Sequence, residues 1–183
     1  KILILLILTC CYNPIAFAQN EPDIKSPSAI LIDAGTGTVL FQKNSHEKLE
    51  PASLTKIMTM LLAFEAIESG DVKLTDIVKV SDRAWKTGGS QVFLGPGEEQ
   101  TLETLLKCIA IASANDASVA VAEHIGGSVD GFVKMMNDRA KALGMKDTYF
   151  VNPHGLSDEG HVTTAYDVAL MARELTKHSK VFN

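Results

Sequence analysis

Cysteine is scarce in this sequence: the 183 residues hold three, and two of them, Cys10 and Cys11, stand together near the N-terminus. Only Cys108 is left for the rest of the chain, so no disulfide can form within that part. The apolar run Ile2–Leu8 is well short of the roughly 20 residues that span a bilayer. Lys and Arg number 17 against 22 Asp and Glu, a formal net charge of -5, and no basic run could neutralise a row of phosphates. These absences argue against a disulfide-stapled scaffold, a membrane anchor at the N-terminus and nucleic-acid binding.

The composition is that of a folded globular protein. Apolar residues make up 46% and charged residues 21% of the chain, so a disordered or collagen-like protein is excluded. A length of 183 residues suits one ordinary domain or the larger part of a two-domain protein.

The first 18 residues are typical of a secretory signal peptide. Lys1 provides a positive start, a short apolar run follows, and Ala16-Phe17-Ala18 places small residues where signal peptidase cleaves. Lipid attachment at Cys10 is disfavoured, because the bulkier Thr9 stands where Gly or Ala is needed. We therefore expect an exported protein.

Residues 19–28 are polar and contain proline, so we interpret them as a leader without a core of its own. Residues 29–183 are expected to form the folded domain. The chain begins at Lys1 rather than Met, so we expect that at least one residue precedes it.

Hydrophobic periodicity predicts a β-hairpin followed by five helices. The glycines between residues 33 and 37 permit the positive φ angles of a tight hairpin. Residues 53–68 are apolar nearly all round and are followed by Gly70, which is typical of a central, buried helix. The other expected elements are a short strand within 72–80, a loop over 86–99, and helices after Thr101, over 117–125, over 129–143 and after Thr164.

Metal and phosphate motifs are missing from the sequence. The five histidines show neither His-Glu-x-x-His nor a pairing with Cys at ligand spacing, and no phosphate-binding glycine motif is present. His154 and His161 flank Asp158 in a glycine-containing loop. A catalytic or ligand role is one interpretation, and hydrogen bonds that order the loop are the one we favour. We expect neither a metal nor a cofactor.

Ser53 and Lys56 are three residues apart at the start of the apolar segment, so on a helix their side chains lie on the same side. Burial disfavours a charged lysine and can make it a base near neutral pH, which a serine nucleophile requires. Ser-x-x-Lys alone is a weak signal, because Ser45 and Lys48 also match it in a polar stretch. Only Ser53 begins a predicted buried helix, which makes Ser53 the candidate nucleophile and Lys56 the candidate base.

A second polar motif, Ser113-Ala114-Asn115, stands at a predicted break between two apolar helices. A hydroxyl and a carboxamide can leave the core there and project into a cleft. A helix cap is the simpler interpretation of the motif taken alone. Its combination with Ser53 and Lys56 favours a catalytic role.

The chain resembles the serine D-alanyl-D-alanine carboxypeptidases, the low-molecular-weight penicillin-binding proteins whose fold is shared with serine β-lactamases. The resemblance covers nearly everything from Ala29 to Lys177 and implies an α+β fold in which helices flank an antiparallel sheet. It rests on four blocks in order: Pro51 to Thr59; Ala84-Trp85 with Gly88-Gly89-Ser90; Ile111 to Ala117; and Asn152-Pro153-His154-Gly155-Leu156.

The resemblance also implies a role for each candidate residue. Ser53 attacks the D-Ala-D-Ala peptide bond of a peptidoglycan stem peptide, and Lys56 takes its proton. Ser113 relays a proton to the departing D-alanine, Asn115 hydrogen-bonds the substrate, and water hydrolyses the acyl-enzyme. The implied partners are the stem peptide and β-lactam antibiotics as acylating inhibitors, and the implied location is the periplasm or the outer face of the cytoplasmic membrane.

The chain departs from the family pattern at the third motif, Lys-Thr-Gly. Lys86-Thr87-Gly88 precedes Ser113, whereas the family places this motif on a strand well after Ser-x-Asn. No Lys-Thr-Gly is found between Ser113 and Asn183, and no amphipathic membrane anchor of the kind many family members carry at the C-terminus is found there. We therefore expect residues 29–183 to be the N-terminal part of a catalytic domain.

Three other functions remain open. A class A β-lactamase needs a carboxylate that activates the deacylating water, and the acidic Asp158 and Glu159 lie in a block that matches the carboxypeptidases. A D,D-endopeptidase cannot be separated by sequence. An inactive remnant that binds peptidoglycan or a partner is the non-enzymatic alternative.

Overall fold

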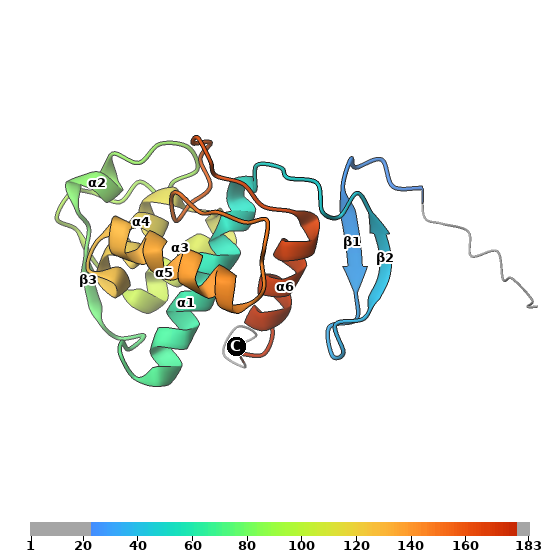
Figure 1. Ribbon diagram of the computed structural model, residues 1–183. Coiled ribbons are helices and arrows are strands. Elements are labelled where there is room, and N and C mark those ends of the chain that lie inside the picture. The colour runs from blue at the N-terminus through green and yellow to red at the C-terminus, as the bar shows by residue number, and fades with distance from the viewer. Residues whose placement is uncertain (1–22, 179–183) are drawn as a thin grey trace, which may run out of the picture.

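The computed structural model describes residues 23–178, so the predicted signal peptide lies outside the described residues. The helices gather into one body, and α6 lies between them and the hairpin β1–β2 (Figure 1). The elements are β1 (Ala29–Ile32), β2 (Val39–Lys43), η1 (Ala52–Leu54), α1 (Thr55–Ser69), β3 (Ile77–Lys79), α2 (Asp82–Trp85), β4 (Glu99–Thr101), α3 (Leu102–Ala112), α4 (Asn115–Gly126), α5 (Val129–Ala142) and α6 (Ala165–Leu175).

Helix α1 is the central helix, as its all-round apolar pattern predicts. Met58 and Leu61 belong to a core cluster shared with α5 and α6, whereas Ala63 and Phe64 belong to a second cluster shared with α3 and α4. The helix ends at Gly70, whose φ of 85° is readily adopted only by glycine. Because α1 is enclosed on several sides, the residues at its N-terminal end are held by the whole helical body.

The predicted hairpin is confirmed. β1 and β2 pair antiparallel, with Ala29 opposite Lys43, and within residues 23–178 neither strand has another strand as partner. Arg173 of α6 donates from Nε to Ala34 O at 2.8 Å and from Nη2 to Gly35 O at 2.7 Å. These contacts fasten the hairpin turn to the helical body.

Other expectations need correction. The helix predicted from Ser53 begins as the 3-10 turn η1, and α1 itself starts at Thr55, because Leu54 N–H bonds to Pro51 O in a tight i to i+3 turn. The sequence pattern missed α2, which is one short turn capped by Ser81. It also missed β4, which pairs with β3 as a second two-stranded sheet. Such short segments carry too little periodicity to be recognised.

The caps predicted for two helices are confirmed. The Thr101 hydroxyl accepts from Thr104 N–H at the start of α3, and the Thr164 hydroxyl accepts from Asp167 N–H at the start of α6. Within residues 23–178 no helix has the length and apolar character that crossing a membrane requires.

Candidate active site

Ser53 and Lys56 form a close pair at the start of the central helix. Ser53 lies in η1 with an exposed side chain, whereas Lys56 lies in the first turn of α1 and is only 5% exposed. Lys56 Nζ is 3.3 Å from Ser53 Oγ. The predicted contact is therefore present, with the lysine buried and the serine open to solvent.

The surroundings of Lys56 favour its neutral form. Burial lowers the pKa of Lys56 from 10.5 to about 8. At pH 7 roughly one molecule in ten then carries a neutral amine. Lys56 Nζ also donates to the backbone oxygen of His154 at 2.7 Å, across 98 residues of chain. This carbonyl holds the amine beside Ser53, so the pair combines a hydroxyl with a positioned base, as acyl transfer requires.

The loop that supplies this carbonyl is built around Asn152. Asn152 Oδ1 accepts from the N–H groups of His154 at 3.3 Å and Gly155 at 2.7 Å, and its Nδ2 donates to Leu156 O at 2.9 Å. Gly155 has a φ of 96°, and a Cβ at this position would lie 1.8 Å from Ala52 O. Only glycine therefore allows the loop to approach η1 so closely.

Both histidines of this region order the loop through hydrogen bonds, as the favoured interpretation predicts, and His154 Nδ1 accepts from Leu156 N–H at 3.2 Å. His161 Nδ1 accepts from Val151 N–H at 2.9 Å, so the ring proton is on Nε2, which is 2.7 Å from Thr55 Oγ1. Burial lowers the pKa of His161. The pKa of His154 is lowered to about 4, first by burial and then by the charge of Lys56. Both rings are therefore neutral at pH 7 and add no charge beside the lysine.

Ser113 ends α3 in the left-handed conformation, with φ 54° and ψ 38°. Glycine is the usual residue there, because a Cβ strains this conformation. Ser113 is the C-cap of α3, in agreement with the helix-cap interpretation, but it caps through its backbone; the N-cap of α4 is Ala114, and no side chain caps that helix. Within residues 23–178 the Ser113 hydroxyl makes no hydrogen bond. Strain at a residue with an uncommitted hydroxyl is typical of a functional position.

Asn115 is the first residue of α4 and is 4% exposed. Its backbone N–H donates to Ser90 O and its Nδ2 donates to Gly88 O, both at 2.7 Å. A Cβ on Gly89 would lie 2.6 Å from Asn115 Nδ2 and 3.2 Å from Leu156 Cδ2. The loop after α2 is therefore in contact with the Ser-x-Asn turn on one side and with the loop that holds Lys56 on the other.

The other motif matches do not form comparable sites. Ser45 is buried and donates to Gln42 Oε1 at 2.9 Å, whereas Lys48 pairs with Asp147 at 3.1 Å. Residues 86–88 follow α2 and lie on no strand, so they do not provide the family's third motif.

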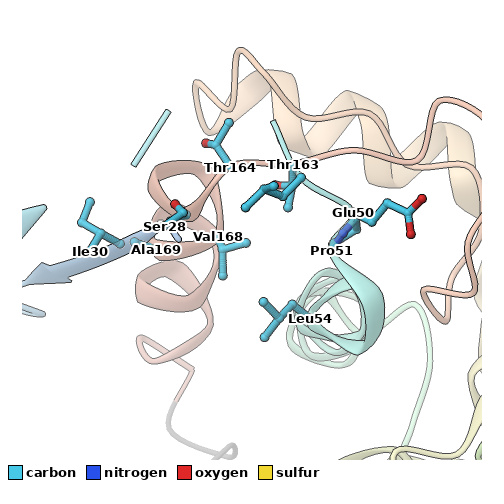
Figure 2. Close-up of a pocket in the computed structure, with 11 residues that line it drawn as sticks. Ser28, Ile30, Glu50, Pro51, Leu54, Thr163, Thr164, Val168 and Ala169 are labelled. Carbon is cyan, nitrogen blue, oxygen red and sulfur yellow. The ribbon is translucent and has the colours of Figure 1, made fainter. Parts of the chain in front are cut away.

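A cavity of about 370 Å³ lies between β1, α6 and the residues just before α1 (Figure 2). Ile30, Pro51, Leu54 and Val168 are among its mostly apolar lining. Neither the Ser–Lys pair nor the Ser-x-Asn turn lines this cavity, so it adjoins the candidate active site without being part of it.

Sequence reasoning missed the contact between Lys56 and the His154 carbonyl. A backbone oxygen leaves no mark in residue types, and the only signal was the block Asn152 to Leu156 with its glycine.

The helical body, the antiparallel hairpin and a serine beside a buried lysine define the fold class of penicillin-binding proteins and serine β-lactamases. Penicillin-binding protein 6B from Escherichia coli has a similar structure, with a TM-score of 0.86 and 37% identity over 92% of this chain and 55% of that one. The profile of Peptidase_S11, described as D-alanyl-D-alanine carboxypeptidase, matches residues 15–182. The chain belongs to this family.

Curated relatives agree with this assignment. The chain is 52% identical over 181 residues to the D-alanyl-D-alanine carboxypeptidase DacF of Bacillus subtilis, a match that covers 96% of this chain and 46% of that protein. It is 41% identical over 174 residues to DacC of Escherichia coli, over 90% of this chain and 44% of that protein. The chain therefore spans about half the length of the curated relatives it matches.

Proposed function

We propose that this chain carries the nucleophile of an exported serine-type D-Ala-D-Ala carboxypeptidase that acts on peptidoglycan stem peptides. The observation that carries the proposal is the exposed Ser53 hydroxyl, 3.3 Å from the amine of a buried lysine whose pKa is about 8. The names of the related carboxypeptidases supply the substrate class.

In the first step Lys56 takes the proton of Ser53 as Ser53 Oγ attacks the carbonyl carbon between the two D-alanines. The Oγ–C bond forms, the C–N bond breaks, and the proton passes to the nitrogen of the departing D-alanine. The Ser53 N–H belongs to the first turn of the η1–α1 segment, where backbone donors lack helical partners. It is therefore placed to stabilise negative charge on the carbonyl oxygen.

Ser113 and Asn115 have distinct roles in this proposal. The free Ser113 hydroxyl relays the proton to the leaving amine, and water then hydrolyses the ester on Ser53. Asn115 already donates through Nδ2 to Gly88 O, so its Oδ1 is the atom that accepts a hydrogen bond from the substrate. Asn115 thus holds both the substrate and the loop after α2.

The partners of this reaction are the stem peptide and β-lactams, which acylate the same serine. The periplasm or the outer face of the cytoplasmic membrane follows as its location, because peptidoglycan lies outside the cytoplasm. The proposed domain organisation is a signal peptide over 1–18, a leader over 19–28, and the N-terminal part of the catalytic domain over 29–183.

The test is to label the full-length protein with benzylpenicillin and to locate the adduct by mass spectrometry, beside an assay of D-alanine release. An adduct on Ser53, lost in Ser53→Ala and kept in Ser45→Ala, is the expected result. An adduct on Ser45 would contradict the assignment. Rapid turnover of penicillin would indicate a β-lactamase, and cleavage of cross-links without release of D-alanine would indicate an endopeptidase.

A further inference from the structure

Phe93 is the most unusual apolar residue near the candidate active site. Its side chain is 85% exposed, and its φ of 58° places a bulky residue in the left-handed region. That conformation is strained for any residue other than glycine, because the Cβ comes too close to the following carbonyl oxygen. Packing of the ring within residues 23–178 does not offset this strain, because most of the side chain is exposed.

The backbone on both sides of Phe93 is held by one buried carboxylate. Asp116 is 1% exposed, and its Oδ2 accepts from Val92 N–H at 3.2 Å and from Leu94 N–H at 3.1 Å. These two bonds fix the residues that flank Phe93. The ring is therefore presented outward by a clamped segment rather than by a loose loop.

The clamp ties Phe93 to the Ser-x-Asn turn. Asp116 directly follows Asn115, and Asn115 binds the same loop through Gly88 and Ser90. Another strongly exposed apolar residue, Ile111 at 85%, precedes Ser113 by two positions. The polar groups of this part of the site are thus accompanied by exposed apolar side chains on fixed backbone.

We propose that Phe93 is a specificity-determining residue that contacts the apolar group of the acyl donor beside the reacting carbonyl. The inference rests on the proposed function, in which Asn115, the neighbour of the clamping Asp116, binds the substrate. The ring is exposed to water, so covering it with an apolar group of a ligand removes apolar surface from water and stabilises the complex. Acyl donors with an apolar side group should therefore react faster than donors without one.

Two penicillins separate this role from a general effect on the site. Benzylpenicillin carries a phenylacetyl group on the nitrogen next to the lactam ring, whereas 6-aminopenicillanic acid carries a free amine there. In the full-length protein, Phe93→Gly should lower the second-order acylation rate constant for benzylpenicillin about tenfold. The constant for 6-aminopenicillanic acid should change less than about twofold, and Phe93→Tyr should keep both near the wild-type values.

Stability and a control variant complete the test. Phe93→Gly should leave the melting temperature unchanged or raise it, because glycine relieves the left-handed strain. Tyr149→Ala removes another exposed aromatic ring and should change neither acylation rate. An equal loss with both penicillins, no loss with either, or a lowered melting temperature would overturn the role of Phe93. A wild-type protein that reacts with neither penicillin would instead overturn the proposed function.

Discussion

Replacement of Ser113 by alanine and by glycine separates its backbone from its hydroxyl. Ser113 occupies the left-handed position that ends α3, where a Cβ adds roughly 1 to 2 kcal/mol of strain. Glycine removes that strain but gives the unfolded chain more freedom, which lowers stability by about 0.4 to 1 kcal/mol. Ser113→Gly should therefore raise the free energy of unfolding by up to about 1.5 kcal/mol. Ser113→Ala keeps the strain and should change it by less than about 0.5 kcal/mol.

The acylation rate should fall in both variants, although neither is expected to be much less stable than the wild type. Both variants lose the hydroxyl that is proposed to relay a proton, so acylation by benzylpenicillin should slow by about 100-fold or more in each. The assay is acylation kinetics on the same samples that are used for denaturant unfolding. Ser113 would thus be a position where a more stable protein is a slower enzyme.

Two results would refute this reasoning. Acylation at the wild-type rate in either variant would mean that the hydroxyl takes no part in the reaction. A Ser113→Gly variant that is less stable than Ser113→Ala would mean that the left-handed conformation carries no strain in the whole protein.

Two further predictions concern Lys56 and Gly155. Acylation should accelerate as the pH rises through about 8, because only neutral Lys56 can take the Ser53 proton. Lys56→Arg should abolish acylation, because a guanidinium does not give up its proton. A flat pH–rate profile would contradict the role of Lys56 as the base. Because the folded state releases this proton near pH 8 and the unfolded chain near 10.5, the free energy of unfolding should also rise with pH between those values, as denaturant titrations can measure. Gly155→Ala should destabilise the protein by more than about 3 kcal/mol and slow acylation, because its Cβ would collide with Ala52 O. Gly160→Ala, with φ 82° but open space around it, is the matched control and should lower stability by only about 1 kcal/mol and leave acylation unchanged.

Sequence by itself determined the parts of this protein that depend on near neighbours in the chain. Helix α1 is apolar nearly all round, which predicts that it is buried at the centre of the fold. Ser53 and Lys56 are three residues apart, which predicts that their side chains are close on one side of a helix. Thr101 and Thr164 could be recognised as caps because a cap binds a backbone N–H within three residues. Each of these predictions needed only the local geometry of a helix.

Tertiary structure alone decided how the site is held. The carbonyl of His154 reaches Lys56 across 98 residues, and its residue type says nothing about that contact, because every residue has a backbone oxygen. Gly155 is required by the approach of its loop to Ala52 O, a distance set by the packing of both segments on the core. The left-handed backbone of Ser113 is fixed in the same way, since two packed helices determine the direction of the turn between them. Sequence could name the reacting side chains, but their pKa and orientation depend on burial and on distant backbone groups, which only the folded chain brings together.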